Sequence, residues 1–143
     1  MTRKEALAEL IAKVEAGKIP SRALDAEVDA VLRIGTPKMQ KEARWAYTNF
    51  PNWSAKEGKP GYCQTDPGGL WWESQKFTTS LDAAKALHEA VLPEWGWRIQ
   101  DCGILCAIVV KGDTLFEAIS TQAARAWLLA ILRALHAQEG GDT

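Results

Sequence analysis

Residues 95–120, WGWRIQDCGILCAIVVKGDTLFEAIS, decide the fold of this 143-residue chain. The stretch contains three extended segments separated by two short turn sequences with Gly and Asp, and the segments span 95–100, 104–110 and 115–120. The first alternates apolar with small or polar side chains, and the second is a continuous apolar run rich in β-branched residues. Three strands joined by two short turns predict an antiparallel meander.

Helical patterns flank this meander on both sides. Thr79 or Ser80 is placed to cap a helix over residues 81–92, and Thr121 is placed to cap a last helix over residues 122–138. The last helix is apolar almost all round, whereas a helix on a protein surface needs only a narrow apolar stripe. We therefore expect it to be covered on two sides or to lie in an oligomer interface.

Two more helical patterns lie upstream, over residues 4–16 and 22–33. We predict an α/β (α+β) fold, an α-β-α sandwich around a three- to four-stranded antiparallel meander, with the C-terminal order α-β-β-β-α and helices covering both faces of the sheet. Acidic side chains of the second helical pattern are expected to face solvent: Asp25, Glu27 and Asp29.

The chain is 47% hydrophobic and 24% charged, which together with its length fits one soluble domain over residues 1–143. A stretch with many Pro and Gly residues, over residues 51–69, predicts a long ordered loop. The predicted parts are N-terminal helices (1–35), a helix with a Trp-, Pro- and Gly-rich loop insertion (36–69), an αβββα core that starts with a short strand (70–138) and a frayed tail (139–143).

Charge and cysteine content exclude several classes of protein. There are 17 Lys and Arg residues against 18 Asp and Glu residues, so the chain is neither a uniformly cationic nucleic-acid coat protein nor an acidic disordered tail. No uncharged apolar run approaches about 18 residues, so we expect no membrane span. The three cysteines are an odd number and the N-terminus has no secretion signal, so we expect reduced thiols in the cytoplasm.

No catalytic or metal-binding constellation stands out, and we expect no enzymatic activity, no metal and no cofactor. His88 and His136 are the only imidazoles, and both are expected on the polar sides of helices. Cys102 and Cys106 flank a turn and do not form the tight ligand pairs of a zinc site. A hydrolase built around one of the two histidines is the alternative that this interpretation leaves open.

The basic and aromatic stretch over residues 33–59 is the best candidate for a binding site. It has six bases against two acids, with aromatic side chains between them. Cations for phosphate and rings for stacking are what single-strand or nucleotide binding requires, although a solvated helix face with rings packed on the core has the same composition. The candidate binding residues are Lys38, Lys41, Arg44, Trp45 and Trp53.

Trp71 and Trp72 form a second candidate feature, directly after two glycines. Adjacent residues of a strand point to opposite faces of the sheet. We therefore expect one of the two rings in the core and the other exposed, in an interface or against a ligand.

Several short stretches resemble the phage ABA sandwich domain family. They are FTTSLDAA (77–84), VLPEWGWR (91–98), AISTQAARA (118–126) with LLAILRAL (128–135), and SRALDAEV (21–28). The resemblance covers residues 21–35 and 70–138. It implies the sandwich fold and a phage or prophage source, and it brings no catalytic residue with it.

These features predict a non-enzymatic phage or prophage accessory protein that binds a host or phage protein in the host bacterial cytoplasm. The apolar perimeter of the last helix motivates this hypothesis and suggests a homo-oligomer. The alternative, less favoured, is binding of a nucleotide or single-stranded nucleic acid through residues 33–59.

Overall fold

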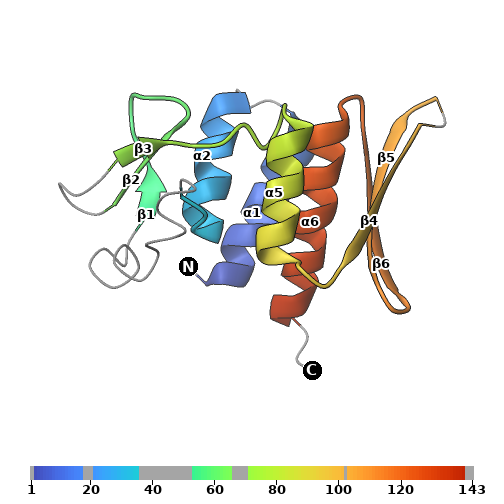
Figure 1. Ribbon diagram of the computed structural model, residues 1–143. Helices are drawn as coiled ribbons and strands as arrows, with labels where there is room; N and C mark the ends of the chain where they lie inside the picture. Colours follow the sequence, from blue (N-terminus) through green and yellow to red (C-terminus); the bar gives the residue numbers. More distant parts are fainter. Residues whose placement is uncertain (1, 18–20, 36–52, 66–70, 102, 141–143) are drawn as a thin grey trace. The chain divides into compact units, whose positions relative to one another are not determined.

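The structure is a computed structural model and describes residues 2–17, 21–35, 53–65, 71–101 and 103–140 (Figure 1). The chain forms two compact units, one made of residues 1–18 and 77–143 and the other of residues 19–76. Both units combine helices with antiparallel strands, so the α+β class predicted from the sequence is confirmed.

Over its described residues, the first unit contains three helices and one three-stranded sheet. The helices are α1 (Arg3–Ala16), α5 (Leu81–Val91) and α6 (Ala123–Gly140), and the strands are β4 (Gly96–Asp101), β5 (Leu105–Lys111) and β6 (Thr114–Ser120). The sheet is antiparallel in the order β4-β5-β6. The predicted meander and the order helix, three strands, helix are therefore confirmed.

Side-chain caps fix where these helices begin. The Thr2 hydroxyl accepts a hydrogen bond from the Glu5 N–H at 3.1 Å, and the Glu5 carboxylate accepts one from the Thr2 N–H at 2.9 Å. The hydroxyl of Ser80, one of the two predicted caps of the next helix, accepts from the Ala83 N–H at 3.2 Å. Gly17 ends α1 with a φ of +64°, a left-handed conformation that favours glycine.

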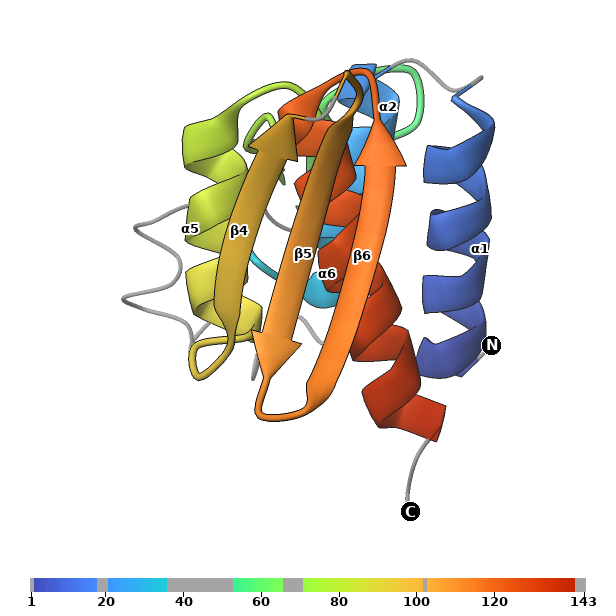
Figure 2. The same cartoon turned by 90° about the vertical axis from the view of Figure 1, so that its right-hand side faces the viewer.

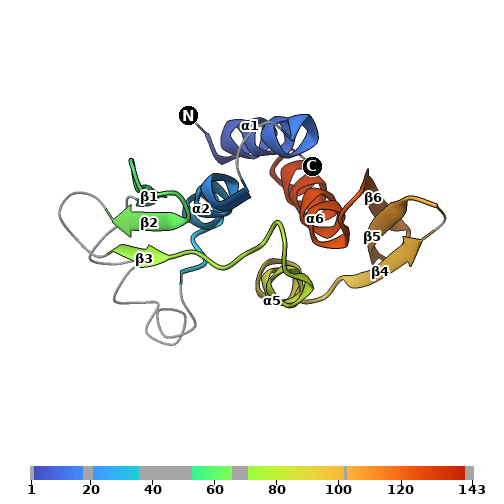
Figure 3. The same cartoon turned by 90° about the horizontal axis from the view of Figure 1, so that it is seen from above.

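Helix α6 is the centre of the first unit. The sheet covers one of its sides through β5 and β6, and α1 and α5 pack against it from the other (Figures 2 and 3). Trp127, Leu128, Ile131 and Leu132 are buried along its length. Of the two explanations for an apolar perimeter, cover on two sides is the one found. The apolar side chains of α6 are therefore buried by other elements of the same unit.

The two faces of the β4–β6 sheet differ. Ala107, Val109 and Ala118 are buried on the face that carries α6, while Leu115 and Ile119 on the opposite face are 52% and 56% exposed. The sequence predicts helices on both faces of this sheet. The difference arises because α6 is apolar on two sides, so α1 and α5 pack on α6 and the described helices of this unit leave the other sheet face uncovered (Figure 2). We call that second face the outer face.

The second unit contains α2 (Ser21–Leu32) and an antiparallel sheet in the order β1-β2-β3, formed by β1 (Trp53–Ala55), β2 (Tyr62–Thr65) and β3 (Trp71–Glu73). Strand β3 confirms the predicted short strand. The prediction of a long loop over residues 51–69 is wrong where the structure describes it, because β1 and β2 lie there. Strands of three or four residues are too short for an alternating hydrophobic pattern to be recognised in the sequence. The helix predicted ahead of the loop in the segment 36–69 lies outside the described residues.

The prediction that Asp25 and Asp29 face solvent is also wrong, since both side chains are fully buried. Asp25 accepts a hydrogen bond from the Arg22 guanidinium at 2.7 Å. Asp29 accepts from the Gly35 N–H at 2.8 Å and from the indole N–H of Trp72 at 3.1 Å. These partners compensate for the loss of water around the carboxylates, and burial raises the pKa of Asp29 above its ordinary value.

Candidate functional site

Three of the seven predicted binding residues lie on the β1–β3 sheet, but on different faces. Trp53 and Trp72 belong, with Cys63, to the face that packs on α2, where Ala26 of the helix joins the same buried cluster. Trp71 points to the opposite face, as expected for the neighbour of a buried strand residue. The other predicted residues lie outside the part of the chain that the structure describes: Lys38, Lys41, Arg44 and Trp45.

Trp53 and Trp72 serve the core of the second unit. Their ring centroids lie 4.7 Å apart in an edge-to-face arrangement, and the Arg33 guanidinium lies 5.0 Å from the Trp53 ring centroid. The indole N–H of Trp72 is used by Asp29. These two residues therefore hold the sheet against α2, and the candidate site reduces to the opposite face.

On that opposite face, four side chains form a cluster that we call the aromatic platform: Lys56, Lys59, Tyr62 and Trp71. The Trp71 side chain is 52% exposed, and its ring centroid lies 5.5 Å from that of Tyr62. The Lys59 Nζ atom lies 4.3 Å from the Trp71 centroid and 4.9 Å from the Tyr62 centroid. The Lys56 Nζ atom lies 5.6 Å from the Trp71 centroid. Two cations are thus held over two partly exposed rings.

The turn between β1 and β2 positions the two lysines. The Lys56 N–H donates to the Tyr62 carbonyl at 2.7 Å, and the Tyr62 N–H donates to the Lys59 carbonyl at 3.2 Å. Gly61 has a φ of +86°, which an L side chain adopts only with strain. This turn folds Lys56 and Lys59 back toward β2 and β3.

Arg22 of α2 ties this turn to the end of β3. Its guanidinium donates to the carbonyl oxygens of Gly61 at 3.3 Å and Ser74 at 2.8 Å. It also forms an ion pair with Glu73, an acid on the platform side of β3, at 3.3 Å. Arg22 therefore compensates the charge of Glu73, the acid that lies on the same side of the sheet as the lysines of the aromatic platform.

An apolar hollow of about 390 Å³ lies beside the aromatic platform, between α2 and the turn. Ala23, Ala26 and Ala55 contribute to its apolar lining, and Lys56 and Lys59 border it. Its volume falls within the range of small-ligand sites. The same two lysines therefore border the exposed rings and this hollow.

Reasoning from the sequence missed part of this cluster. Lys56 and Lys59 belong to the basic stretch of residues 33–59 but are not among the predicted binding residues, and no sequence motif indicates Tyr62. The alternation of side chains along a strand could have identified Tyr62. If Cys63 and Trp72 face the core, their neighbours Tyr62 and Trp71 share the opposite face of the sheet.

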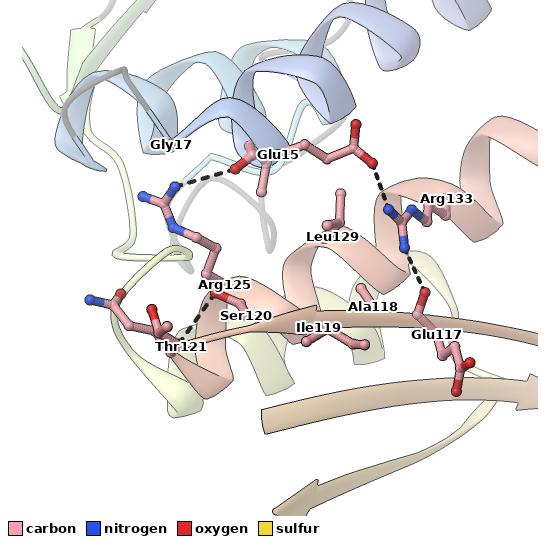
Figure 4. Close-up of a pocket in the computed structure, with 12 residues that line it drawn as sticks. Glu15, Gly17, Glu117, Ala118, Ile119, Ser120, Thr121, Arg125, Leu129 and Arg133 are labelled. Carbon is pink, nitrogen blue, oxygen red and sulfur yellow. Dashed lines mark hydrogen bonds and ion pairs between the residues drawn. The ribbon is translucent and has the colours of Figure 1, made fainter. Parts of the chain in front are cut away.

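A groove of about 810 Å³ lies in the first unit, lined by α1, β6 and α6 (Figure 4). Its arginines are engaged within the chain. Arg133 donates to the Glu117 carbonyl at 2.7 Å and to the Glu15 carboxylate at 2.5 Å, and Arg125 donates to the Val14 carbonyl at 3.4 Å. These bonds connect α1 and β6 to α6, so we assign the arginines a structural role.

His88 is buried, in contrast to the solvated position predicted for it. Its Nδ1 atom accepts a hydrogen bond from the indole N–H of Trp127 at 3.2 Å, and its Nε2 atom lies 2.8 Å from the Trp95 carbonyl. Because an indole only donates and a carbonyl only accepts, the ring is neutral with its proton on Nε2. Both nitrogens of His88 are thus occupied by partners in the fold, while His136 is half-buried.

The thiol of Cys63 is buried, donates to the Ala26 carbonyl at 3.0 Å and lies 3.2 Å from the Ser74 hydroxyl. Burial raises its pKa to about 12, so it stays protonated at neutral pH. Within the described ranges, no three His, Cys, Asp or Glu side chains gather as a metal site would need. The described helices also include none with the length and apolar character required to cross a membrane.

Comparisons of the chain with protein-family models, with curated proteins and with solved structures find no match.

Proposed function

We propose that the aromatic platform binds single-stranded nucleic acid, with Trp71 as the stacking ring and Lys56 and Lys59 as the phosphate contacts. The observation that carries this proposal is a Trp ring that is 52% exposed on a sheet face, with two ammonium groups 4.3 and 5.6 Å from its centroid. Exposed rings beside cations are the elements with which proteins bind single strands.

The energies of the competing contacts favour a base over the lysine. An exposed cation–π contact is worth about 0.5–1 kcal/mol, whereas stacking of a base on an aromatic side chain is worth about 1–3 kcal/mol. A base can therefore replace Lys59 above the Trp71 ring. The displaced ammonium group then lies close to the stacked nucleotide and can reach its phosphate.

The balanced charge of the chain limits the strength of this interaction. The formal net charge is −1, so long-range attraction to a polyanion is absent and the local lysines must supply the electrostatic contribution. Two phosphate contacts to a single strand predict a slope of about −1.4 for the logarithm of the binding constant against the logarithm of salt concentration.

The test is the fluorescence anisotropy of a labelled oligothymidylate at low salt. We expect Trp71→Ala to weaken binding by about 5- to 150-fold, the equivalent of one lost stacking contact. Trp71→Phe keeps a smaller ring and should lose less, and Lys59→Gln should lower the salt slope by about 0.7. Lys85→Gln, an exposed lysine on α5, is the matched control and should bind as the wild type does.

Absence of binding at low salt, or equal affinity of the wild type and Trp71→Ala, would refute the proposal. Action on a host or phage protein, the first function expected from the sequence, loses its original support because α6 is covered by the sheet, α1 and α5. A phage or prophage source stays a prediction from the resemblance.

A further inference from the structure

The outer face of the β4–β6 sheet carries three rows of side chains. The strand register sets the rows from β4 through β5 to β6: Gly96, Val110, Leu115; Arg98, Ile108, Glu117; and Gln100, Cys106, Ile119. Apolar residues dominate the central strand and one edge, and opposite charges occupy the two ends of the middle row. Figure 2 looks directly onto this face.

We propose that this outer face packs against the same face of a second copy of the chain, about a two-fold axis that runs parallel to β5. The inference is independent of the aromatic platform, which belongs to the other unit. It rests on the charges, the shape and the size of the face.

The charges are self-complementary in only one of the two symmetric arrangements. A two-fold axis parallel to the strands exchanges β4 and β6 but keeps each row, so Arg98 faces Glu117 of the second copy, and this pair occurs twice. An axis perpendicular to the strands instead places Arg98 on Arg98 and Glu117 on Glu117. Like charges in contact oppose association, so the middle row selects the parallel axis.

The shapes of the side chains agree with this choice. The parallel axis places Leu115, an exposed side chain, opposite Gly96 of the second copy, which has no side chain. The β5 residues Cys106, Ile108 and Val110 then meet their own counterparts near the axis. Facing sheets pack at about 30° to each other, so these pairings are approximate at the corners and closest at the centre.

The size of the outer face sets the expected affinity of the dimer. Three strands about 4.8 Å apart and six or seven residues long give a face of roughly 14 by 20 Å, and its side chains would bury roughly 800–1,000 Å² in total on pairing. That area is at the low end for specific interfaces. We therefore expect a weak dimer whose population rises over the micromolar range.

The decisive experiment is charge reversal followed by sedimentation equilibrium. Arg98→Glu and Glu117→Arg each place like charges opposite one another, and each should weaken dimerisation by at least about tenfold. The double variant restores two opposite pairs and should dimerise as the wild type does. Lys85→Glu, with an equal charge change on α5, is the control, and circular dichroism melting checks that all variants fold.

A second readout uses the thiol at the axis. In a Cys102→Ser background, N-ethylmaleimide should modify Cys106 more slowly as protein concentration rises, because the second copy covers it, whereas Cys63 is buried at every concentration. Ile119→Lys should remove this dependence on concentration. A chain that stays monomeric, a dimer indifferent to Arg98→Glu, or a double variant without recovery would each overturn the proposal and leave the face to a different partner.

Discussion

The indole N–H of Trp127 in α6 donates to Nδ1 of His88 in α5 at 3.2 Å, and the other nitrogen of His88 lies 2.8 Å from the Trp95 carbonyl. One neutral imidazole therefore links two helices and the segment that enters β4. Trp97 extends the contact, because its ring centroid lies 4.3 Å from that of Trp127. Trp127 and the Trp95 carbonyl thus hold a buried histidine at the junction of α5, α6 and the sheet.

Replacement of Trp127 by Phe tests this junction. The change leaves the buried Nδ1 atom of His88 without its donor and leaves a small cavity, so the free energy of unfolding should fall by about 2–4 kcal/mol. Trp71→Phe, the same substitution at an exposed ring, should change it by less than about 0.5 kcal/mol. Urea unfolding measures both, and equal effects of the two variants would contradict the assigned role of Trp127.

Asp29 provides a second test through an isosteric change. Both of its oxygens accept N–H donors, so the amide of Asp29→Asn places an NH₂ group against the Gly35 N–H or the Trp72 indole N–H. We expect a loss of about 1–3 kcal/mol of stability, measured by urea unfolding at neutral pH. A variant as stable as the wild type would show that Asp29 does not hold these donors.

The pH dependence of the same pair follows from the direction of the pKa shift. Burial raises the pKa of Asp29, so the native state binds a proton more readily than the unfolded state, whose carboxyl has a pKa near 3.8. Ionisation of Asp29 therefore costs stability above its folded pKa, and that cost disappears as the pH falls toward 3.8. The stability of the wild type relative to Asp29→Asn should rise on acidification, and a fall would contradict the burial argument.

Cys63 makes the stability of the protein depend on pH at the alkaline end of the range. Its pKa is raised from 9.0 to about 12, so between these values the unfolded chain loses a proton that the native chain keeps. The wild type should lose stability as the pH rises through this window, by up to about 1.4 kcal/mol per pH unit. Cys63→Ala should lose less over the same window, and parallel curves for the two proteins would count against the shift.

Gly61 and Gly58 offer a matched pair in the turn that carries the lysines. Both have a positive φ, of +86° and +76°, but a Cβ atom on Gly61 would lie 2.7 Å from the Arg22 Nε atom whereas one on Gly58 meets nothing within 4 Å. Gly58→Ala should therefore cost only the backbone strain, about 1–2 kcal/mol. Gly61→Ala should cost more, because Arg22 must also move. Thermal melts of both variants check this order, and an equal loss would show that Arg22 adapts freely.

The meander and its flanking helices were predictable because their information is local. Alternation, a β-branched run and turn residues mark the strands of residues 95–120, and Ser80 marks the start of α5. The apolar perimeter of α6 even indicated cover on two sides. What the perimeter could not indicate is that α1 and α5 provide the second cover, which leaves one face of the sheet exposed.

The features that were missed depend on partners distant in sequence. The buried Asp29 accepts a hydrogen bond from Trp72, 43 residues later in the chain, and no helical period contains that information. Trp53 and Trp71 are both predicted binding residues, yet the register of three short strands separates them onto opposite faces. The solvated position predicted for His88 is wrong for the same reason, since its donor Trp127 lies 39 residues further along the chain.

The first unit is assembled from the two ends of the chain, as the Glu15–Arg133 ion pair across 118 residues illustrates. During synthesis, α1 leaves the ribosome long before α6, the helix on which it packs, has been made. The second unit, in contrast, is one continuous segment and has all its residues available earlier. Translation therefore imposes an order in which the internal segment is free to fold first, while the N-terminal helix waits for the final one.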